Sequence, residues 1–273
     1  MSFKKFIPQK PLNEFIDSIV QIDIKSGLLD STKTLFIPNG HSALVIHLSN
    51  SVCITHNGTN VLLPNMFFTG ILNTHVHLVP TGDLCSIFVL FKPDALYHLF
   101  KIDMEELNRI QYTQIDNIIG HTAYVLYEQL LFAETINERI KLIECFFNNY
   151  TNQIDITGNS IKFIYNKIIM EKGCTRVADL SEYFNIPTRS LHRKFTTQTG
   201  LTPKEFARMI RFKSIVHYLH APQKLDWAEI VNVVDLTDQS HLINEIKRFT
   251  GYSPQKFMAL NQDVLSILNG TIK

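Results

Sequence analysis

The chain has 273 residues, 45% of them hydrophobic and 19% charged. This length suggests about two domains, and this composition argues against disorder. The net charge of +1 conceals an asymmetry, because residues 1–157 carry 10 Lys and Arg against 15 Asp and Glu, whereas residues 158–273 carry 16 against 10. A basic half joined to an acidic half predicts that the basic half binds a polyanion.

Membrane and secreted classes are not favoured. The beginning of the chain has no apolar run long enough for a signal peptide, and no stretch reaches the roughly 18 apolar residues of a spanning helix. The cysteines, which form no CxxC pair, argue against a zinc knuckle and a disulfide framework. We therefore expect a cytoplasmic protein with no membrane partner. We also expect Cys85 and Cys145 to be buried, because free cysteine behaves as a small apolar residue.

The first hundred residues alternate short apolar runs with turn signals. PNGH (38–41), HNGT (56–59) and PTGD (80–83) supply the Asn, Gly and Pro that tight turns require. Eight strands at such spacing predict a sandwich or a small barrel. The strands are expected at Ile19–Ile24, Thr34–Ile37, Ala43–Leu48, Val52–Thr55, Val61–Leu63, Met66–Thr69, His75–Val79 and Ser86–Phe91.

The hydrophobic period becomes helical from Pro93. Proline suits the first turn of a helix over 93–102, and apolar residues three and four apart predict helices over 116–132 and 134–150. Their apolar faces must be buried, either in the core of the first domain or in a dimer face. The polar stretch 151–158 is the expected linker between a domain over 1–150 and a helical domain over 159–273.

The most informative run is VADLSEYFNIPTRSLHRKFTTQTGLTP (177–203). It predicts a short amphipathic helix over Val177–Phe184, a break at Asn185-Ile186-Pro187, and a second helix whose first unpaired amides Thr188 caps. The second helix has apolar residues four apart on one side and basic residues on the other. Two short helices with a tight turn and a basic exposed face predict a helix-turn-helix unit.

A second run repeats the end of the first. When DQSHLINEIKRFTGYSP (238–254) is aligned on its glycine, Gly251 corresponds to Gly200 and Ser253-Pro254 corresponds to Thr202-Pro203. A helix over Trp227–Val234 would begin this second pair, and a continuous helix over 203–220 would join the two pairs. Such a spacer sets two units at a fixed separation, and successive major-groove faces lie about 34 Å apart.

With these residues, the stretch 159–258 resembles the DNA-binding domain of the AraC/XylS family of bacterial transcription regulators. The resemblance lies in LHRKF and TGLTPKEF (191–206), in Arg211, and in DQSHL and KRFTGYSPQKF (238–257). It implies a domain with two helix-turn-helix units that binds double-stranded DNA. We therefore expect a transcription regulator and not an enzyme, with no catalytic residue, cofactor or metal.

The resemblance also implies roles for individual residues. Arginine suits guanine and asparagine suits adenine, whereas phosphate contacts add affinity that depends on salt and carries no sequence information. The expected base-reading residues are Arg189, His192, Arg193, Gln239, Ser240 and Asn244, with Ile243 also facing the bases. The expected phosphate contacts are Thr188, Lys194, Thr196, Lys204, Lys247 and Arg248.

The second unit departs from the family pattern. Asp235-Leu236 stands where the family usually has Gly-Phe, so Asp235 fills a left-handed position that glycine tolerates better. Leu242 and Ile246 replace core aromatic residues, and Asn244 replaces an arginine that often faces the bases. We therefore assign most of the sequence discrimination to residues 188–196.

The front half resembles the cupin-like effector and dimerisation domains that often precede this DNA-binding domain. GHSALVIHL (40–48) and FVLFKPDALYHLF (88–100) carry this resemblance. The expected fold is thus an α+β protein of two domains, a small β-barrel with helices followed by an all-α domain. The resemblance implies a small-molecule effector in the barrel, a homodimer, and contact with RNA polymerase if the protein is an activator.

Two alternatives concern the front half alone. His75 and His77 alternate on an expected strand and would face the same side, as in a metal-dependent cupin enzyme or a metal sensor. His41 or His47 could supply a third ligand, but no Glu follows at the cupin spacing, so the ligand set is incomplete. The other alternative is a module that dimerises without binding a ligand.

Overall fold

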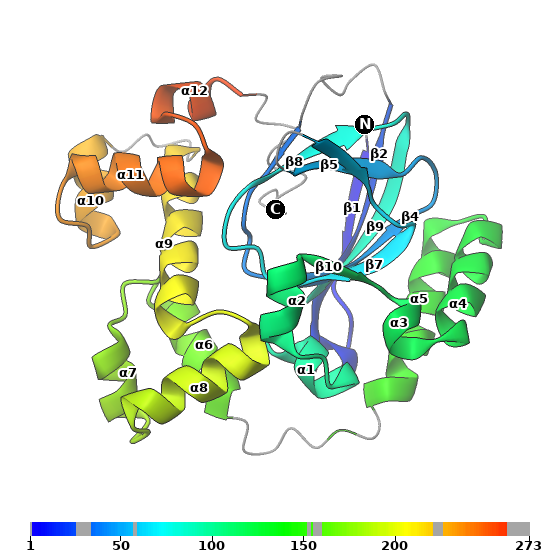
Figure 1. The fold of residues 1–273 in the computed structure, drawn as a ribbon, viewed down its shortest axis with the longest axis horizontal. Coiled ribbons are helices and arrows are strands. Elements are labelled where there is room, and N and C mark those ends of the chain that lie inside the picture. Colours follow the sequence, from blue (N-terminus) through cyan, green and yellow to red (C-terminus); the bar gives the residue numbers. More distant parts are fainter. Residues whose placement is uncertain are drawn as a thin grey trace.

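A computed structural model describes residues 2–25, 34–56, 59–151, 154, 160–220 and 226–260. A β-rich amino-terminal unit lies beside a helical carboxyl-terminal unit (Figure 1), which confirms the expected order of the two fold types. The expected linker, 151–158, falls mostly outside the described residues, so the domain boundaries stay a prediction. Every helix in the described ranges is too short or too polar to cross a membrane.

The described strands form two antiparallel sheets. The first has the order β1-β2-β9-β4-β7-β10 and the second has the order β3-β8-β5-β6. The bounds are β1 Ser2–Phe6, β2 Ile16–Ile24, β3 Thr34–Phe36, β4 Ser42–His47, β5 Val52–His56, β6 Thr59–Leu62, β7 Met66–Thr69, β8 Val76–Pro80, β9 Leu84–Phe91 and β10 Tyr112–Gln114.

All eight expected strands are present, and the sequence did not indicate β1 or β10. Both strands lie at edges of the first sheet. The residues of β1 are mostly exposed and β10 has only three residues, so neither shows a clear apolar pattern. In the described part of the chain no strand pairing joins the two sheets. A closed cupin-like barrel is therefore not confirmed.

The central strand β4 is buried along its whole length because it has core on both sides. Leu44 and Ile46 pack with the helices of the amino-terminal unit. Ala43 and Val45 pack toward the second sheet. Alternate residues of a strand point to opposite faces, so His41 and His47, in step with Ala43 and Val45, lie on the face toward the second sheet.

The helices of the amino-terminal unit cover the first sheet and one end of the molecule. They are α1 Ala95–Phe100, α2 Met104–Ile110, α3 Asp116–Ile119, α4 His121–Phe132 and α5 Ile136–Thr151. The expected helix over 116–132 is divided at Gly120, whose φ is +62°. The apolar pattern did not indicate α2, although Asp103 caps this helix by accepting bonds from the amides of Glu105 and Glu106.

The carboxyl-terminal unit is helical wherever it is described. Its helices are α6 Ser160–Met170, α7 Val177–Tyr183, α8 Thr188–Thr199, α9 Pro203–Leu219, α10 Trp227–Val233, α11 Gln239–Thr250 and α12 Pro254–Met258. The helix α9 runs from α8 to α11 (Figure 1). Phe206 of α9 packs on Phe195 of α8, with ring centres 5.6 Å apart, and Phe212 stacks on Phe249 of α11 at 4.7 Å.

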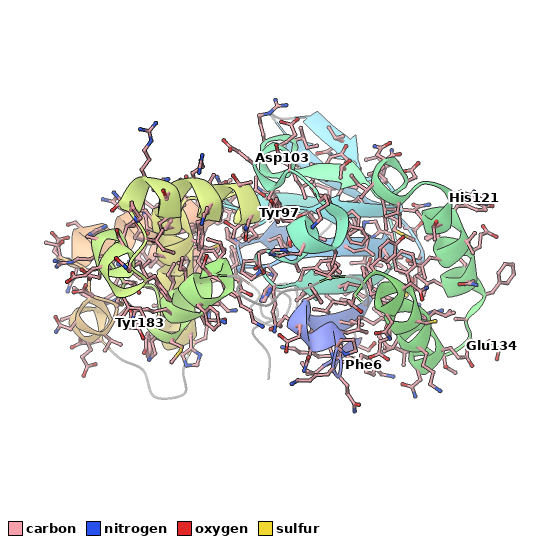
Figure 2. The ribbon with its side chains drawn as sticks, turned by 90° about the horizontal axis from the view of Figure 1, so that it is seen from below. Phe6, Tyr97, Asp103, His121, Glu134 and Tyr183 are labelled. Carbon is pink, nitrogen blue, oxygen red and sulfur yellow. The ribbon has the colours of Figure 1, made fainter. Side chains whose placement is uncertain are left out.

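The two units share an apolar interface. Leu35, Ile37 and Ile71 of the amino-terminal unit belong to the same buried cluster as the core of the helical unit. The helices α4 and α5 lie away from this interface, and Figure 2 shows His121 of α4 at the opposite end of the molecule from Tyr183 of α7.

The cysteine predictions meet different outcomes. Cys145 is exposed on α5, so its expected burial is wrong. Cys145 lies five residues after the buried Ile140, and this spacing places it outside the buried side of the helix. Cys85 is half-buried, and its thiol contacts Asp23. Burial and this carboxylate raise the pKa of the Cys85 thiol to about 12, which makes it a poor nucleophile.

Candidate nucleic-acid interface

The turn between α7 and α8 is held by its own backbone. Asn185 adopts a left-handed conformation with φ of +49°, and the Ile186 amide donates to the Ser181 carbonyl at 3.0 Å. The expected cap at Thr188 is wrong, because Pro187 occupies the capping position with no side-chain bond. Thr188 is the first helical residue, and its hydroxyl donates to Ser181 Oγ at 3.0 Å.

The turn between α10 and α11 repeats this geometry. Asp235 has φ of +52°, as the sequence predicts for the position usually filled by glycine. The Leu236 amide donates to the Val231 carbonyl at 3.0 Å, as Ile186 does to Ser181. A non-glycine residue at positive φ is uncommon, and Asn and Asp are the types that tolerate it. Aspartate therefore preserves the turn.

The ends of α8 and α11 are also built alike. Gly200 and Gly251 both end their helices with φ of +75°, a conformation natural to glycine. Thr199 Oγ1 donates to the Phe195 carbonyl at 2.8 Å, and Thr250 Oγ1 donates to the Ile246 carbonyl at 2.7 Å. The sequence repeat is thus a repeat of local structure, seen in both helix pairs.

The second helix of the first pair presents a basic surface. Leu191 and Phe195 are fully buried on one side of α8, which leaves the other side to solvent. Lys204 is exposed at the beginning of α9, and the exposed residues of α8 include five of the expected DNA contacts. These residues are Thr188, Arg189, His192, Arg193 and Lys194.

Thr196 differs from the other expected phosphate contacts. Its side chain is half-buried, and its hydroxyl oxygen is buried without a hydrogen-bond partner. A buried hydroxyl cannot reach a phosphate from this position. The structure therefore places Thr196 apart from the exposed set.

The second helix of the second pair presents fewer charges. Leu242, Ile246 and Phe249 bury one side of α11. Asp238 caps the helix by accepting from the His241 amide at 2.8 Å. The expected contacts on this helix are all exposed, with Ile243 half-buried beside them; they are Gln239, Ser240, Asn244, Lys247 and Arg248.

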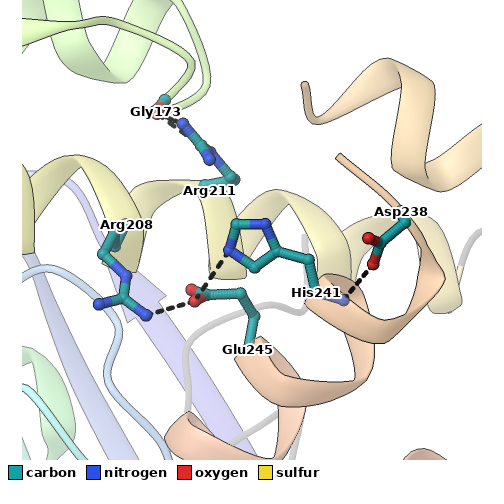
Figure 3. Close-up of polar contacts among 6 residues, drawn as sticks. All are labelled: Gly173, Arg208, Arg211, Asp238, His241 and Glu245. Atoms are coloured by element: carbon teal, nitrogen blue, oxygen red, sulfur yellow. Dashed lines mark hydrogen bonds and ion pairs between the residues drawn. The ribbon is translucent and has the colours of Figure 1, made fainter. Parts of the chain in front are cut away.

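A buried ion pair fixes α11 on α9 (Figure 3). Glu245 is only 2% exposed, and its Oε1 accepts from Arg208 of α9. His241 Nε2 lies 3.9 Å from the same oxygen, whereas the buried Oε2 has no partner. Breaking a buried ion pair is costly because it leaves one charge uncompensated. The pair therefore holds the second helix pair on the spacer.

Arg211, one turn further along α9, anchors a different segment. Its guanidinium donates to the Gly173 carbonyl at 3.0 and 3.3 Å (Figure 3). Neither Arg208 nor Glu245 was expected in the site. One signal was available, because Glu245 lies three residues from Leu242 and four from Phe249, on the apolar side of the helix. An acid at such a position indicates a buried partner.

The amino-terminal unit contacts the ends of both α8 and α11. Asn108 Nδ2 of α2 donates to the Gly200 carbonyl at 2.9 Å. A Cβ at Gly251 would lie 2.6 Å from His75 Nε2, and His77 Nε2 lies 3.0 Å from the Tyr252 hydroxyl. Burial lowers the pKa of His75. Both helix pairs are thus held against the same neighbouring unit.

These contacts bear on the metal alternative. His75 and His77 face the end of α11, as neighbours on one side with ring centres 5.3 Å apart. Within the described ranges no group of three or more His, Cys, Asp or Glu residues is placed to hold a metal ion. His41 and His47 have other partners, the Phe91 carbonyl at 3.1 Å and Ser86 Oγ at 2.8 Å.

Comparisons with known proteins agree with this architecture. A family described as a helix-turn-helix domain matches residues 180–259, which begin within α7 and continue past α11, and a domain of unknown function, DUF6597, matches residues 4–113. The Msm operon regulatory protein of Streptococcus mutans is 29% identical over 176 residues. That alignment covers 62% of this chain and 62% of the relative.

Three solved structures are also similar in fold to the chain. ToxT from Vibrio cholerae has a TM-score of 0.46 at 12% identity, with 97% of this chain and 100% of that chain covered. A form of ToxT with a bound unsaturated fatty acid has the same score over 93% of this chain and 96% of that chain. The AraC-like transcriptional activator CuxR has a TM-score of 0.28 at 14% identity, covering 79% of this chain and 86% of that chain.

The exposed face of α8 lies within residues 180–259, which the helix-turn-helix family matches, and the two observations together define a helix-turn-helix protein. The chain therefore carries a helix-turn-helix domain over residues 180–259 and is similar to the regulatory protein of Streptococcus mutans.

Proposed function

We propose that this protein regulates transcription by reading specific double-stranded DNA with two helix-turn-helix units, one in each helix pair. The observation that carries the proposal is the face of α8, where Arg189, His192 and Arg193 are exposed on a helix with a buried opposite side. A helix of this kind fits the major groove. The spacer α9 has 17 residues and is about 25 Å long, comparable with the ~34 Å between successive groove faces.

The two sets of contacts have different roles. Arg189, His192, Arg193, Gln239, Ser240 and Asn244 read base edges. Thr188, Lys194, Lys204, Lys247 and Arg248 contact phosphates, which fixes the register of the protein on the duplex. Thr196 is left out of the proposal because its hydroxyl is buried.

A second copy of the chain is the proposed partner of α4 and α5. A groove of about 840 Å³ lies between these helices. Tyr124 and Phe132 line it and are 58% and 81% exposed, and apolar surface of this kind marks interaction sites. Glu128 and Lys141 also line the groove. In a two-fold dimer the acid of one copy would meet the base of the other.

A small molecule in the amino-terminal unit is the proposed control. A cavity between the two sheets, hereafter the inter-sheet cavity, is lined by residues of both, including Asn39 and His41. Lys213 of α9 donates to the Asn39 carbonyl at 3.4 Å, and a Cβ at Gly40 would lie 3.4 Å from Ile210 of α9. Residues 39–41 therefore connect the cavity with the spacer between the DNA-reading units.

A ligand that binds one arrangement of the units better than another shifts the population toward it. In this proposal the domain over 1–150 receives the ligand and dimerises, and the domain over 159–273 binds DNA in the cytoplasm, without a catalytic step. As an activator the protein would also contact RNA polymerase.

The test is selection from a pool of random duplexes by the purified full chain across a salt series, followed by sequencing. Enrichment of one motif that spans two groove faces supports reading by both units. Enrichment over one face alone removes the second unit from the proposal. An Arg189→Ala, Arg193→Ala double variant is the control and should lose the enrichment. If nothing is enriched, the protein is not a sequence-specific reader.

A further inference from the structure

The inter-sheet cavity is apolar along its walls. It is lined mainly by aliphatic and aromatic side chains from both sheets, among them Val45, Phe67 and Leu90. The described residues that line it include no Asp, Glu, Lys or Arg. A charged ligand would find no counter-ion in the wall, and burying an unpaired charge is expensive.

His47 supplies an unpaired polar atom at one end of this cavity. The residue is 3% exposed at the end of β4. Its Nδ1 lies 2.8 Å from Ser86 Oγ, and its backbone amide donates to the Asn65 carbonyl at 2.7 Å. Its Nε2 is buried and has no hydrogen-bond partner. Buried polar groups in proteins are nearly always bonded, so an open one calls for a partner.

The imidazole of His47 is neutral at physiological pH. Burial lowers the pKa of His47 to about 4. If the Ser86 hydroxyl donates to Nδ1, Nε2 carries the proton and is a donor; if Nδ1 donates, Nε2 is an acceptor. A hydroxyl group can satisfy either tautomer because it both donates and accepts. A carboxylate can satisfy only one, and its charge would be buried without a cation.

Gln111 and Tyr112 also line the cavity, and three other polar groups along its wall have partners. His41 Nδ1 is 3.1 Å from the Phe91 carbonyl, and the Thr69 hydroxyl donates to the Gly70 carbonyl at 2.7 Å. Asn39 Oδ1 accepts from the His41 amide at 3.1 Å. Unlike these three groups, His47 Nε2 has no hydrogen-bond partner.

The volume limits the size of the occupant. The inter-sheet cavity measures about 100 Å³, somewhat less than the roughly 150 Å³ that holds benzene in an engineered apolar core. A short alkyl chain therefore fits the cavity as it stands, and a single ring fits only with a slight widening between the sheets.

We infer that the inter-sheet cavity binds a small, uncharged hydroxy compound with an apolar body, whose hydroxyl group bonds to His47 Nε2. This inference rests on the proposed control by a small molecule and names the chemical class of its ligand. The apolar body of the ligand packs against the side chains along the strands. Its hydroxyl group fixes the orientation of the ligand by bonding to His47.

Three probes test the class of ligand: phenol, toluene and benzoate. Phenol and toluene have nearly the same shape, so their difference reports the hydroxyl, and benzoate reports a negative charge. Dissociation constants would come from NMR titrations of the full chain, with the His47 ring signal as a local readout. We expect phenol to bind about tenfold more tightly than toluene, since the alternative leaves a buried atom unpaired. Benzoate should bind most weakly.

The two histidines of this strand face provide a matched control. His47→Phe should reduce the ratio of the phenol and toluene constants to about one, whereas His41→Phe should keep it near ten. Ala43→Leu, which fills the cavity and leaves His47 in place, should weaken all three probes. The comparison of probes on the wild-type chain stands even where a variant fails to fold.

Several results would overturn the inference: tightest binding of benzoate, equal binding of phenol and toluene, or no titration of any probe. DNA retention measured on the same samples separates this inference from the proposed function. If the protein binds specific DNA but none of the probes, the inferred ligand class is wrong and the proposed DNA-binding function stands. If the protein binds the probes as expected but selects no duplex, the proposed sequence-specific DNA binding is wrong and the inferred ligand site stands.

Discussion

The two helix pairs share a backbone and differ in surface. Their turns have left-handed residues at equivalent places, Asn185 and Asp235, and their second helices end at glycines with the same φ of +75°. On α8 there are three cations and no acid, whereas α11 has two cations and the acid Glu245. The two helix pairs thus repeat one backbone geometry with two different sets of surface side chains.

The sharpest difference lies at one aligned position. Six residues before the terminal glycine, α8 has Lys194, which is exposed, and α11 has Glu245, which is buried against Arg208. The first helix pair can offer this position to DNA, but the second uses it to attach to the spacer. The same aligned position is therefore exposed in the first pair and an anchor in the second.

The largest expected effect comes from removing the anchor. Glu245→Ala leaves Arg208 without its partner, and we expect the free energy of unfolding to fall by about 3 kcal/mol. Lys194→Ala, at the aligned position of α8, should change it by less than about 0.5 kcal/mol. Urea unfolding followed by the fluorescence of Trp227, the single tryptophan, measures both. Equal stability of the two variants would remove the distinction between the helix pairs.

Base reading should divide unequally between α8 and α11. Arg193→Ala should weaken binding to the selected DNA motif by about 1–3 kcal/mol and relax preference at one base pair. Asn244→Ala, at the aligned position, should cost less than about 1 kcal/mol if the second half-site is read weakly. Competition binding with specific and random duplexes gives both values. An equal loss on random DNA would reassign Arg193 to a phosphate.

Phosphate contact should depend on exposure. Lys247→Ala should weaken all sequences alike and reduce the salt slope of binding by about 1. Thr196→Ala, at the aligned position of α8, should leave the slope unchanged because the Thr196 hydroxyl is buried. Binding constants across a salt series decide this pair. A sequence-selective loss with Lys247→Ala would contradict its role.

The smallest effect concerns docking on the amino-terminal unit. Burial lowers the pKa of His75 beside Gly251, so the undocked state binds more protons as the pH falls below about 6.5. Between about pH 7.5 and pH 5.5, the opening equilibrium at 250–253, which is obtained by dividing the exchange rate by its intrinsic rate at each pH, should increase by up to about tenfold. Exchange at 199–202, docked through the neutral Asn108, should not change beyond its intrinsic dependence on pH.

Two controls belong to this experiment. His77 faces His75, the Tyr252 hydroxyl lies 3.0 Å from His77 Nε2, and Lys256 lies over the Tyr252 ring. These three groups must therefore be unchanged in the variants that are compared. His75→Gln removes the titrating group and should abolish the increase. An increase in both segments together would show a general loosening of the interface.

Most secondary structure was accessible from the sequence because its signals are local. Period-two runs and Asn-Gly turns indicated eight strands, and apolar residues four apart with a terminal glycine indicated α8 and α11. The sequence did not indicate the two strands at the edges of the first sheet, because an edge strand such as Ser2–Phe6 needs no apolar pattern. The closure of the barrel could not be judged either, because closure depends on which distant strands pair.

The exposed contacts on α8 and α11 followed from helix periodicity, and the exceptions did not. Thr196 was expected at the surface, yet its hydroxyl is buried. Glu245 was not expected in the site, yet it joins two helices. In each case the surroundings come from residues that are remote in the chain.

The sequence by itself determined the helix-turn-helix domain, the repeated helix pair and the basic face, because spacing and residue type act over a few neighbouring positions. Only the tertiary structure decided that Glu245 anchors α11, that His47 offers a free nitrogen to a cavity, and that one unit holds the ends of both helices. Burial and pairing of a polar group depend on the segments packed around it, and these come together only in the folded chain.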